Sequence, residues 1–322
     1  MFVDTTRGTP ANGTAPMSPE RHLPTEIWYP ATTSDTSPDS VTRDAPVDPT
    51  GRPYPLLIYV HGSSGSRRTS AFLPEALARA GYVVAAADFP LTASTTPGGA
   101  SDLHVDDQLG DLSFLADQLA ARAADAKDLF AGAVDPKTGY AVAGHSTGGT
   151  VALLAAFAPD VLDPRLKAAI ALAPCACFFG DSFFTTRSLP LLVAAGTDDL
   201  LVPIANNGAR AYALARAPKI LATIVGGTHL YFTDFAIPDD ALHPSPTTAH
   251  DDIAKALARY GGGTVCEPVP PPASDPILAV ETQHQVTIDL VRAFLDANLR
   301  ARAGLLDAIE KRPPAALRIL KE

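Results

Sequence analysis

Residues 140–154 read YAVAGHSTGGTVALL, and this stretch is the basis of our fold prediction. An apolar run of strand length leads into Gly-His-Ser-Thr-Gly at 144–148, and an Ala/Leu-rich run of helix length follows. A serine in so sharp a turn is pushed out of the edge of a sheet. Glycines flank it because a Cβ would collide with the neighbouring strand and helix. The alternative is an ordinary Gly/Ser loop that caps a helix, but the context favours Ser146 as an exposed nucleophile.

Length and composition predict one α/β domain with decorations. The chain has 322 residues, of which 46% are hydrophobic, so it can bury a large core. The formal net charge of −10 argues against nucleic acid or an anionic membrane as a partner, because both would repel this surface. No apolar run reaches about 18 residues, so we expect no membrane-spanning helix.

The three cysteines help to indicate the cellular compartment in which the protein works. Cys266 pairs with Cys175 or Cys177 in one interpretation, and all three are free thiols in the other. A zinc site is not expected, since no histidine lies at zinc-finger spacing from the cysteine pair. The N-terminus lacks the features of a signal peptide. The polar Pro/Thr arm, the few lysines and the bridge interpretation favour a secreted or periplasmic protein whose signal has been removed, with a cytoplasmic protein as the alternative.

Strand-like and helix-like stretches alternate along most of the chain. Residues 1–22 read as an extended arm, residues 31–53 as an exposed connection, and residues 230–282 as an irregular insert that forms a lid or a wall. Strands are predicted at 23–29, 54–60, 82–87, 140–143, 167–173, 189–195 and 219–225. Helices are predicted at 70–80, 105–124, from 147 onward, at 204–215, 251–260 and 283–300.

This alternation predicts an α/β fold with a mostly parallel central sheet and helices on both faces. The domain is expected to span residues 23–300, followed by a frayed helical tail at 301–322. The carboxyl ends of parallel strands meet at one edge of the sheet. Polar residues that follow these strands are therefore the candidate site residues.

A serine hydroxyl needs a base to take its proton and a carboxylate to orient that base. The strand at 189–195 runs into GTDDLLVP, which places Asp198 and Asp199 at the sheet edge. We favour Asp199 as the orienting acid and Asp198 as a turn or capping residue, although both would also suit a solvated turn. The next strand ends in GGTHLYF, which makes His229 the predicted base. His61 and His145 are expected to brace loops.

An oxyanion needs two N–H donors. Thr147 begins the helix after the predicted nucleophile, where the helix dipole strengthens its N–H, and Ser63 follows His-Gly in the small-residue loop HGSSG at 61–65. We predict substrate contacts in three places: the aromatic segment after the strand at 167–173, the residue after Ser63, and the residue after His229. The aromatic segment would equally suit an ordinary part of the core. The predicted substrate residues are Phe178, Phe179, Phe183, Ser64 and Leu230.

The motifs His-Gly after an apolar strand, GHSTG, GTDDLLVP and GGTH, in this order, resemble the α/β-hydrolase superfamily. More narrowly, the chain resembles its dienelactone-hydrolase-like branch, which is related to bacterial platelet-activating-factor acetylhydrolases and polyester-cleaving cutinases. The stretches TEIWYP at 25–30, DFPLT at 88–92 and DQLGD at 107–111 also look like that branch.

The resemblance implies a serine esterase that acts through an acyl-enzyme, without metal or organic cofactor, on small to medium esters that include lipid or polyester. Ser146 stands where true dienelactone hydrolases have a cysteine, so lactone specificity is not implied. The insert at 230–282 is foreign to a minimal cutinase. Two alternatives are acyl transfer or perhydrolysis on the same triad, and a catalytically silent binding protein of the same fold.

Overall fold

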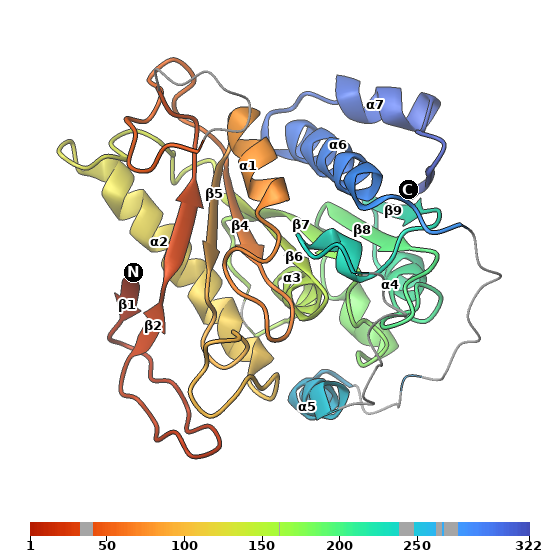
Figure 1. Ribbon diagram of the computed structural model, residues 1–322, viewed down its shortest axis with the longest axis horizontal. Helices are drawn as coiled ribbons and strands as arrows, with labels where there is room; N and C mark the ends of the chain where they lie inside the picture. Colours follow the sequence, from red (N-terminus) through yellow and green to blue (C-terminus); the bar gives the residue numbers. More distant parts are fainter. Residues whose placement is uncertain (33–40, 161, 238–247, 262–265, 267–275) are drawn as a thin grey trace.

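Eight strands form one sheet in the computed structural model, which describes residues 1–32, 41–160, 162–237, 248–261, 266 and 276–322 (Figure 1). The spatial order is β10-β9-β8-β7-β6-β4-β5-β3. The six inner strands run parallel, whereas β3 and β10 pair antiparallel at the two edges. The predicted fold class, a mostly parallel α/β sheet, is confirmed. The strands span Thr25–Trp28 (β3), Leu56–Val60 (β4), Val83–Ala87 (β5), Tyr140–His145 (β6), Leu166–Leu172 (β7), Leu191–Gly196 (β8), Lys219–Ile224 (β9) and Leu317–Lys321 (β10).

The inner strands are apolar on both faces because helices cover both. Every residue of β4, β5, β6 and β8 is buried, which explains why these strands read as continuous hydrophobic runs. The chain builds β4 and β5 first and then crosses to β6 on the other side of β4. The loops that follow β4 and β6 therefore diverge at the sheet edge, and ligands of open α/β sheets bind at such a point.

Two groups of helices form the outer layers (Figure 1). Helices α1 (Phe72–Arg79), α6 (Val280–Leu299) and α7 (Gly304–Lys311) pack on one face, and α2 (Gln108–Ala124), α3 (Thr147–Phe157) and α4 (Gly208–Leu214) pack on the other. Helix α3 is buried along its whole length, which its Ala/Leu-rich sequence allows. None of the described helices is long and apolar enough to cross a membrane.

The N-terminal arm is more ordered than we expected. Strands β1 (Phe2–Asp4) and β2 (Arg21–Leu23) pair antiparallel, so residues 1–22 are largely a hairpin rather than an extended arm. The Arg21 side chain is 1% exposed and donates two hydrogen bonds to the Asp111 carboxylate of α2, at 2.8 and 2.7 Å. Arg7 bonds both Asp4 and Asp111. This buried ion cluster fixes the arm to the domain, and the sequence pattern of 1–22 contains no sign of it.

The prediction of a frayed tail at 301–322 is wrong. These residues contain α7 and β10, and β10 completes the sheet by pairing with β9. The tail is held because Leu306, Ile309 and Leu317 are buried against the core.

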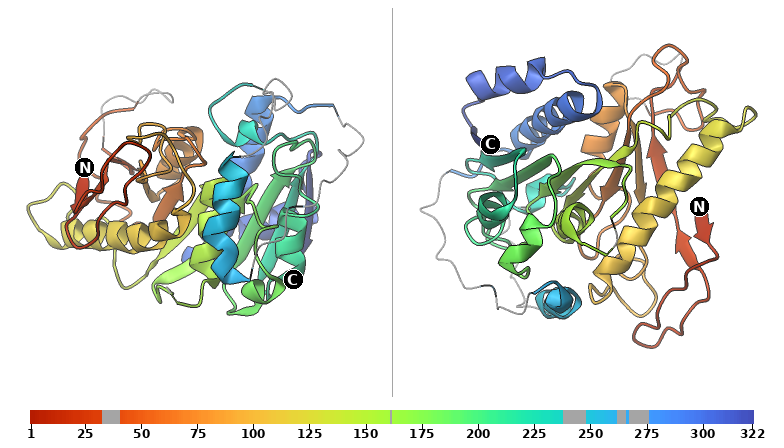
Figure 2. Two further views of the ribbon diagram at one scale, coloured as in Figure 1. Left: turned by 90° about the horizontal axis from the view of Figure 1, so that it is seen from below. Right: turned by 180° about the vertical axis from the view of Figure 1, so that it is seen from behind.

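Part of the insert at 230–282 lies outside the described residues, namely 238–247, 262–265 and 267–275. The described part contains α5 (Thr248–Leu257) and the 3₁₀ turn η5 (Ala258–Tyr260), and Figure 2 shows α5 lying across one end of the molecule. Ile253 and Leu257 of α5 join the core on the α3 face. Cys177 and Cys266 form a disulfide, whereas Cys175 is a buried free thiol, so the bridge interpretation is confirmed with Cys177 as the partner.

Candidate active site

Ser146 stands in the strand-to-helix turn that the sequence predicts, between β6 and α3. Its backbone has φ 56° and ψ −121°, a conformation that is costly for a residue with a side chain. A Cβ on Gly144 would run into the carbonyl oxygen of Gly148, and a Cβ on Gly148 would run into that of Val60. The turn therefore requires both glycines, and the elbow geometry is confirmed.

Asp199 and His229 meet above the ends of β8 and β9. The Nδ1 atom of His229 lies 2.8 Å from Oδ2 of Asp199, and the residues are 4% and 2% exposed. The other carboxylate oxygen accepts the backbone N–H groups of Leu201 at 3.1 Å and Val202 at 2.6 Å. With Nδ1–H donated to the carboxylate, Nε2 of His229 is left as the basic nitrogen.

Asp198, the other carboxylate of the GTDDLLVP loop, has a local role. Its Oδ2 accepts the hydroxyl of Thr197 at 2.9 Å, and its backbone N–H bonds the carbonyl of Gly227. The structure therefore pairs His229 with Asp199, the carboxylate that the sequence analysis favoured over Asp198.

Two further histidines brace this edge of the sheet, as expected. The ring of His145 lies 4.5 Å from that of His229 and hydrogen-bonds its backbone, and burial lowers the pKa of His145 well below its usual range. Since His145 directly precedes Ser146, this contact places the imidazole of His229 beside the elbow. His61 accepts the N–H of Phe89 on Nε2 at 3.2 Å, so its Nδ1 carries the proton and donates to the Gly62 carbonyl at 2.7 Å.

The loop after β4 approaches the elbow closely. A Cβ on Gly62 would lie 3.1 Å from Cβ of Ser146, so only a glycine lets this loop come so near without displacing a neighbour. Among the described residues, no backbone carbonyl accepts the N–H of Ser63 or of Thr147, which leaves both donors available. Ser64, by contrast, donates its N–H to Thr92 at 2.9 Å, and its side chain is exposed.

Asp102 is a site residue that the sequence analysis missed. It is 1% exposed, its Oδ2 lies 3.4 Å from Oγ1 of Thr147, and the Ser63 hydroxyl lies close enough to its carboxyl group to lower the pKa. Burial raises its pKa to about 6, the charge of Asp252 on α5 acts in the same direction, and the two hydroxyls oppose the shift. Asp102 ends an irregular loop rich in Gly, Thr and Ser, so no strand or motif marks it in the sequence.

The aromatic crossing lies in the interior. Phe178, Phe179 and Phe183 are 4%, 1% and 4% exposed, and the rings of Phe179 and Phe183 stack with centroids 4.0 Å apart. Tyr260 of η5 packs edge-on against both rings. The cluster thus joins the insert to the body, while Leu230, which begins the 3₁₀ turn η3 (Leu230–Phe232) directly after His229, is half-buried.

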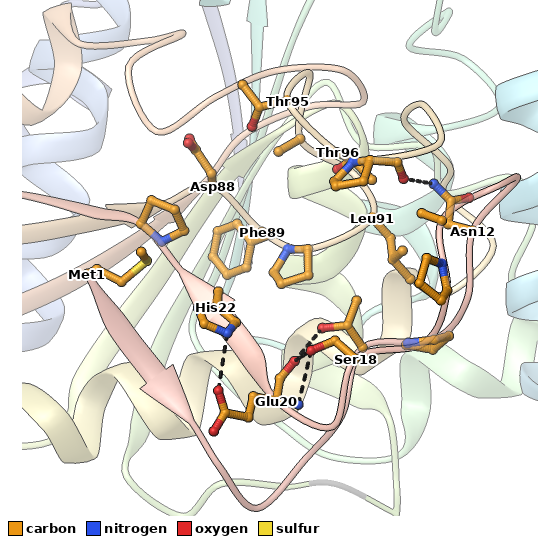
Figure 3. A pocket seen from close by; sticks show the side chains of 18 residues that line it. Met1, Asn12, Ser18, Glu20, His22, Asp88, Phe89, Leu91, Thr95 and Thr96 are labelled. Atoms are coloured by element: carbon orange, nitrogen blue, oxygen red, sulfur yellow. Dashed lines mark hydrogen bonds and ion pairs between the residues drawn. The ribbon is translucent and has the colours of Figure 1, made fainter.

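A cavity of about 350 Å³ lies between the N-terminal arm and the segment 88–97 (Figure 3). Phe89 and Leu91 line it from one side, and the side chains of Glu20 and His22, which lie 3.3 Å apart, line it from the other. None of Ser146, Asp199 and His229 lines it. Its wall is nevertheless tied to the loop after β4, because Ser94 donates its N–H to the Gly65 carbonyl at 2.8 Å.

The comparisons with known proteins agree with this fold. The model of the Alpha/beta hydrolase family matches residues 57–314. No curated protein matches the sequence significantly. Among solved structures, the ferulic acid esterase from Streptomyces cinnamoneus superposes with a TM-score of 0.62 at 24% identity, over 99% of this chain and 94% of that one. At this identity the likeness concerns the fold alone, and the narrower resemblance to the dienelactone-hydrolase-like branch stays a prediction.

Proposed function

Since the chain belongs to the alpha/beta hydrolase family, we propose that it is a serine carboxylic-ester hydrolase with Ser146 as nucleophile, His229 as base and Asp199 as orienting acid. The observation that carries the proposal is the buried 2.8 Å contact between His229 and Asp199 beside the strained turn of Ser146. A buried imidazole that is oriented by a carboxylate next to a serine in such a turn is the arrangement that activates a hydroxyl for attack on a carbonyl carbon.

The proposed cycle has two halves. Nε2 of His229 takes the proton of the Ser146 hydroxyl as the oxygen attacks the ester carbonyl, and Asp199 stabilises the resulting imidazolium. The carbonyl oxygen becomes an oxyanion held by the N–H groups of Ser63 and Thr147. Each such donor is typically worth about 3 kcal/mol of barrier. The alcohol leaves with the proton from His229, and water then repeats the sequence to release the acid.

The substrate class rests on the sequence motifs. We propose small to medium esters, because this is the substrate class that the resemblance of the sequence motifs implies. The shared fold with a ferulic acid esterase supports including aromatic acyl esters in the test panel. Lipid and polyester esters, which the narrower resemblance suggests, complete the panel.

The decisive experiment compares Ser146→Ala with the wild-type protein on p-nitrophenyl esters of increasing acyl length, ferulic acid esters, phospholipid and polyester film. Loss of one triad nucleophile typically lowers kcat by about 10⁶-fold, and the melting temperature should not fall. Ser182→Ala, which changes an exposed serine on η2 (Asp181–Thr185), is the matched control. Hydrolysis by Ser146→Ala at the wild-type rate, or failure of the wild type to label with a fluorophosphonate, would refute the proposal.

We also propose that the protein works in an oxidising compartment, either secreted or periplasmic. The disulfide between Cys177 and Cys266 supports this location, since such bonds persist where thiols are not kept reduced. Intact mass of the protein purified from its native host, alkylated with and without prior reduction, tests it. A fully alkylated protein without reduction would place it in a reducing compartment.

A further inference from the structure

The backbone around Asp102 is fixed on both sides. Ser101 donates its N–H to the Leu91 carbonyl at 2.7 Å, and its hydroxyl bonds Asp252 of α5 at 2.9 Å. The carbonyl of Asp102 accepts the N–H of Val105 at 3.2 Å, which opens the 3₁₀ turn η1 (Val105–Asp107). The carboxyl group is therefore held in one place rather than on a free loop.

The carboxyl group of Asp102 is buried without a cation. It is 1% exposed, and in the part of the chain that the structure describes no arginine or lysine pairs with it and Oδ1 has no hydrogen-bond partner. Burying a carboxyl group that lacks a charged partner is costly, so buried carboxylates are usually paired. A position that carries this cost without a stabilising ion pair points to a role other than stability.

The two hydroxyls beside this carboxyl group identify that role. Oδ2 accepts the Thr147 hydroxyl at 3.4 Å, and the Ser63 hydroxyl lies close enough to the same carboxyl group to lower its pKa. Ser63 belongs to the loop after β4 and Thr147 to the first turn of α3, and these are the two segments whose N–H groups point to the oxyanion in the proposed cycle. One carboxyl group thus lies beside two segments that are far apart in the sequence.

We propose that Asp102 is a positioning residue of the oxyanion hole: by accepting the hydroxyls of Ser63 and Thr147, it sets the distance between their two N–H donors. The inference rests on the proposed hydrolase function. Asp102 acts through its two partners and not on the substrate, because a carboxylate in contact with the oxyanion would repel it. The positive end of the α3 dipole, at Thr147, offsets part of the carboxylate charge.

The bond to Thr147 is long for an O–H···O contact, whose usual length is about 2.7 to 2.8 Å. Catalytic hydrogen bonds are often long in the free enzyme and shorten when the reacting group fills the site. The contribution of Asp102 is therefore expected in the transition state, where donor spacing matters most, and not in ground-state binding.

The test compares Asp102→Ala and Asp102→Asn with the control Asp106→Asn, which makes the same chemical change at an acid that pairs with Arg259. We measure kcat and KM on a p-nitrophenyl ester and the affinity for phenylboronic acid, which forms a tetrahedral adduct with a serine nucleophile. Asp102→Ala should lower kcat about 10- to 100-fold with KM within about twofold, and weaken boronate binding by a similar factor. Asp102→Asn keeps an acceptor oxygen and should stay within about threefold of the wild type, as should Asp106→Asn.

Three results would overturn the inference: wild-type kcat in Asp102→Ala, a loss of kcat without weaker boronate binding, or an Asp102→Asn variant as impaired as Asp102→Ala. If Asp102→Ala does not fold, Thr147→Val removes the hydroxyl while keeping the backbone N–H. It should then show the kcat loss with unchanged KM, and wild-type kcat in this variant also refutes the inference. An inactive Ser146→Ala beside a normal Asp102→Ala would refute only this inference, whereas an active Ser146→Ala refutes the proposed function itself.

Discussion

Two loops each place a buried carboxyl group in the candidate active site, one against His229 and the other against Thr147, and the two groups have different partners. In the loop after β8, Asp199 receives two backbone N–H groups and the imidazole of His229. In the loop 91–102, Oδ2 of Asp102 accepts the Thr147 hydroxyl at 3.4 Å, the Ser63 hydroxyl acts on the same carboxyl group, and the pKa of Asp102 rises to about 6. Burial alone therefore does not define a catalytic acid. The partners decide whether the group is held as a charge that orients a base or as an acceptor that positions neighbours.

The largest expected loss of kcat in this group of predictions comes from changing Asp199. Asp199→Asn leaves a near-isosteric side chain but removes the charge that orients His229 and stabilises its imidazolium, so kcat should fall by about 10³- to 10⁴-fold. Asp198→Asn, one residue away in the same loop, should stay within about threefold. Steady-state kinetics on one ester compare the two, and equal losses would mean that the acid has been assigned to the wrong carboxylate.

The next effect concerns the insert that carries α5, whose Asp252 acts on the pKa of Asp102. The Cys177–Cys266 bridge closes a loop of 89 residues and ties the insert that carries α5 to the aromatic crossing. Cys177→Ser should therefore lower the free energy of unfolding by about 2 to 4 kcal/mol, measured by urea denaturation without reductant. Reductant should bring the wild type down to the level of the variant and leave the variant unchanged. A variant as stable as the oxidised wild type would show that the insert holds its place through packing alone.

The third prediction separates the two carboxyl groups by pH. The folded pKa of Asp102, about 6, lies above its ordinary value of 3.8, so the stability linked to its proton is present below about pH 4 and is lost as pH rises through 6. Asp102→Asn, which cannot ionise, should exceed the wild type by up to about 3 kcal/mol at pH 8 and match it near pH 4. Melting temperatures at both pH values check this, and a difference independent of pH would contradict the buried charge.

The smallest expected effect tests how much Asp252 contributes to the raised pKa of Asp102. The charge of Asp252 on α5 raises the pKa of Asp102, second among the raising influences to burial itself. Asp252→Asn should therefore move the pKa of Asp102 down by less than one unit, observed as a lower midpoint of the stability–pH curve. Asp251→Asn, which changes the exposed neighbour on the same helix, should leave the midpoint in place. Equal shifts in the two variants would point to general screening rather than to this pair.

The sequence predicted the parts of the molecule that local chemistry determines. The inner strands are continuous apolar runs because both faces are covered, and Gly144 and Gly148 mark the turn of Ser146 because no Cβ fits there. Asp199 was predictable because it follows a strand in a recognisable motif. Asp102 was not, because its importance arises from Ser63 and Thr147, which only the folded sheet brings to it. The pairing of β10 with β9 is likewise a tertiary contact without a local signal.

Strand β10 has a consequence beyond the architecture. It pairs with β9 from Leu317 to Lys321, and Glu322 continues the ladder by exchanging backbone bonds with Lys219 at 3.0 and 2.9 Å. Without these last residues, β9 would present a row of free N–H and C=O groups, which is a template for strands of other molecules. Residues 317–322 therefore replace the largely apolar edge of β9 with an edge that carries Arg318 and Lys321, and charged side chains on an edge strand disfavour pairing with other molecules. A shortened chain would be expected to self-associate into cross-molecular sheets before it lost any of its chemistry.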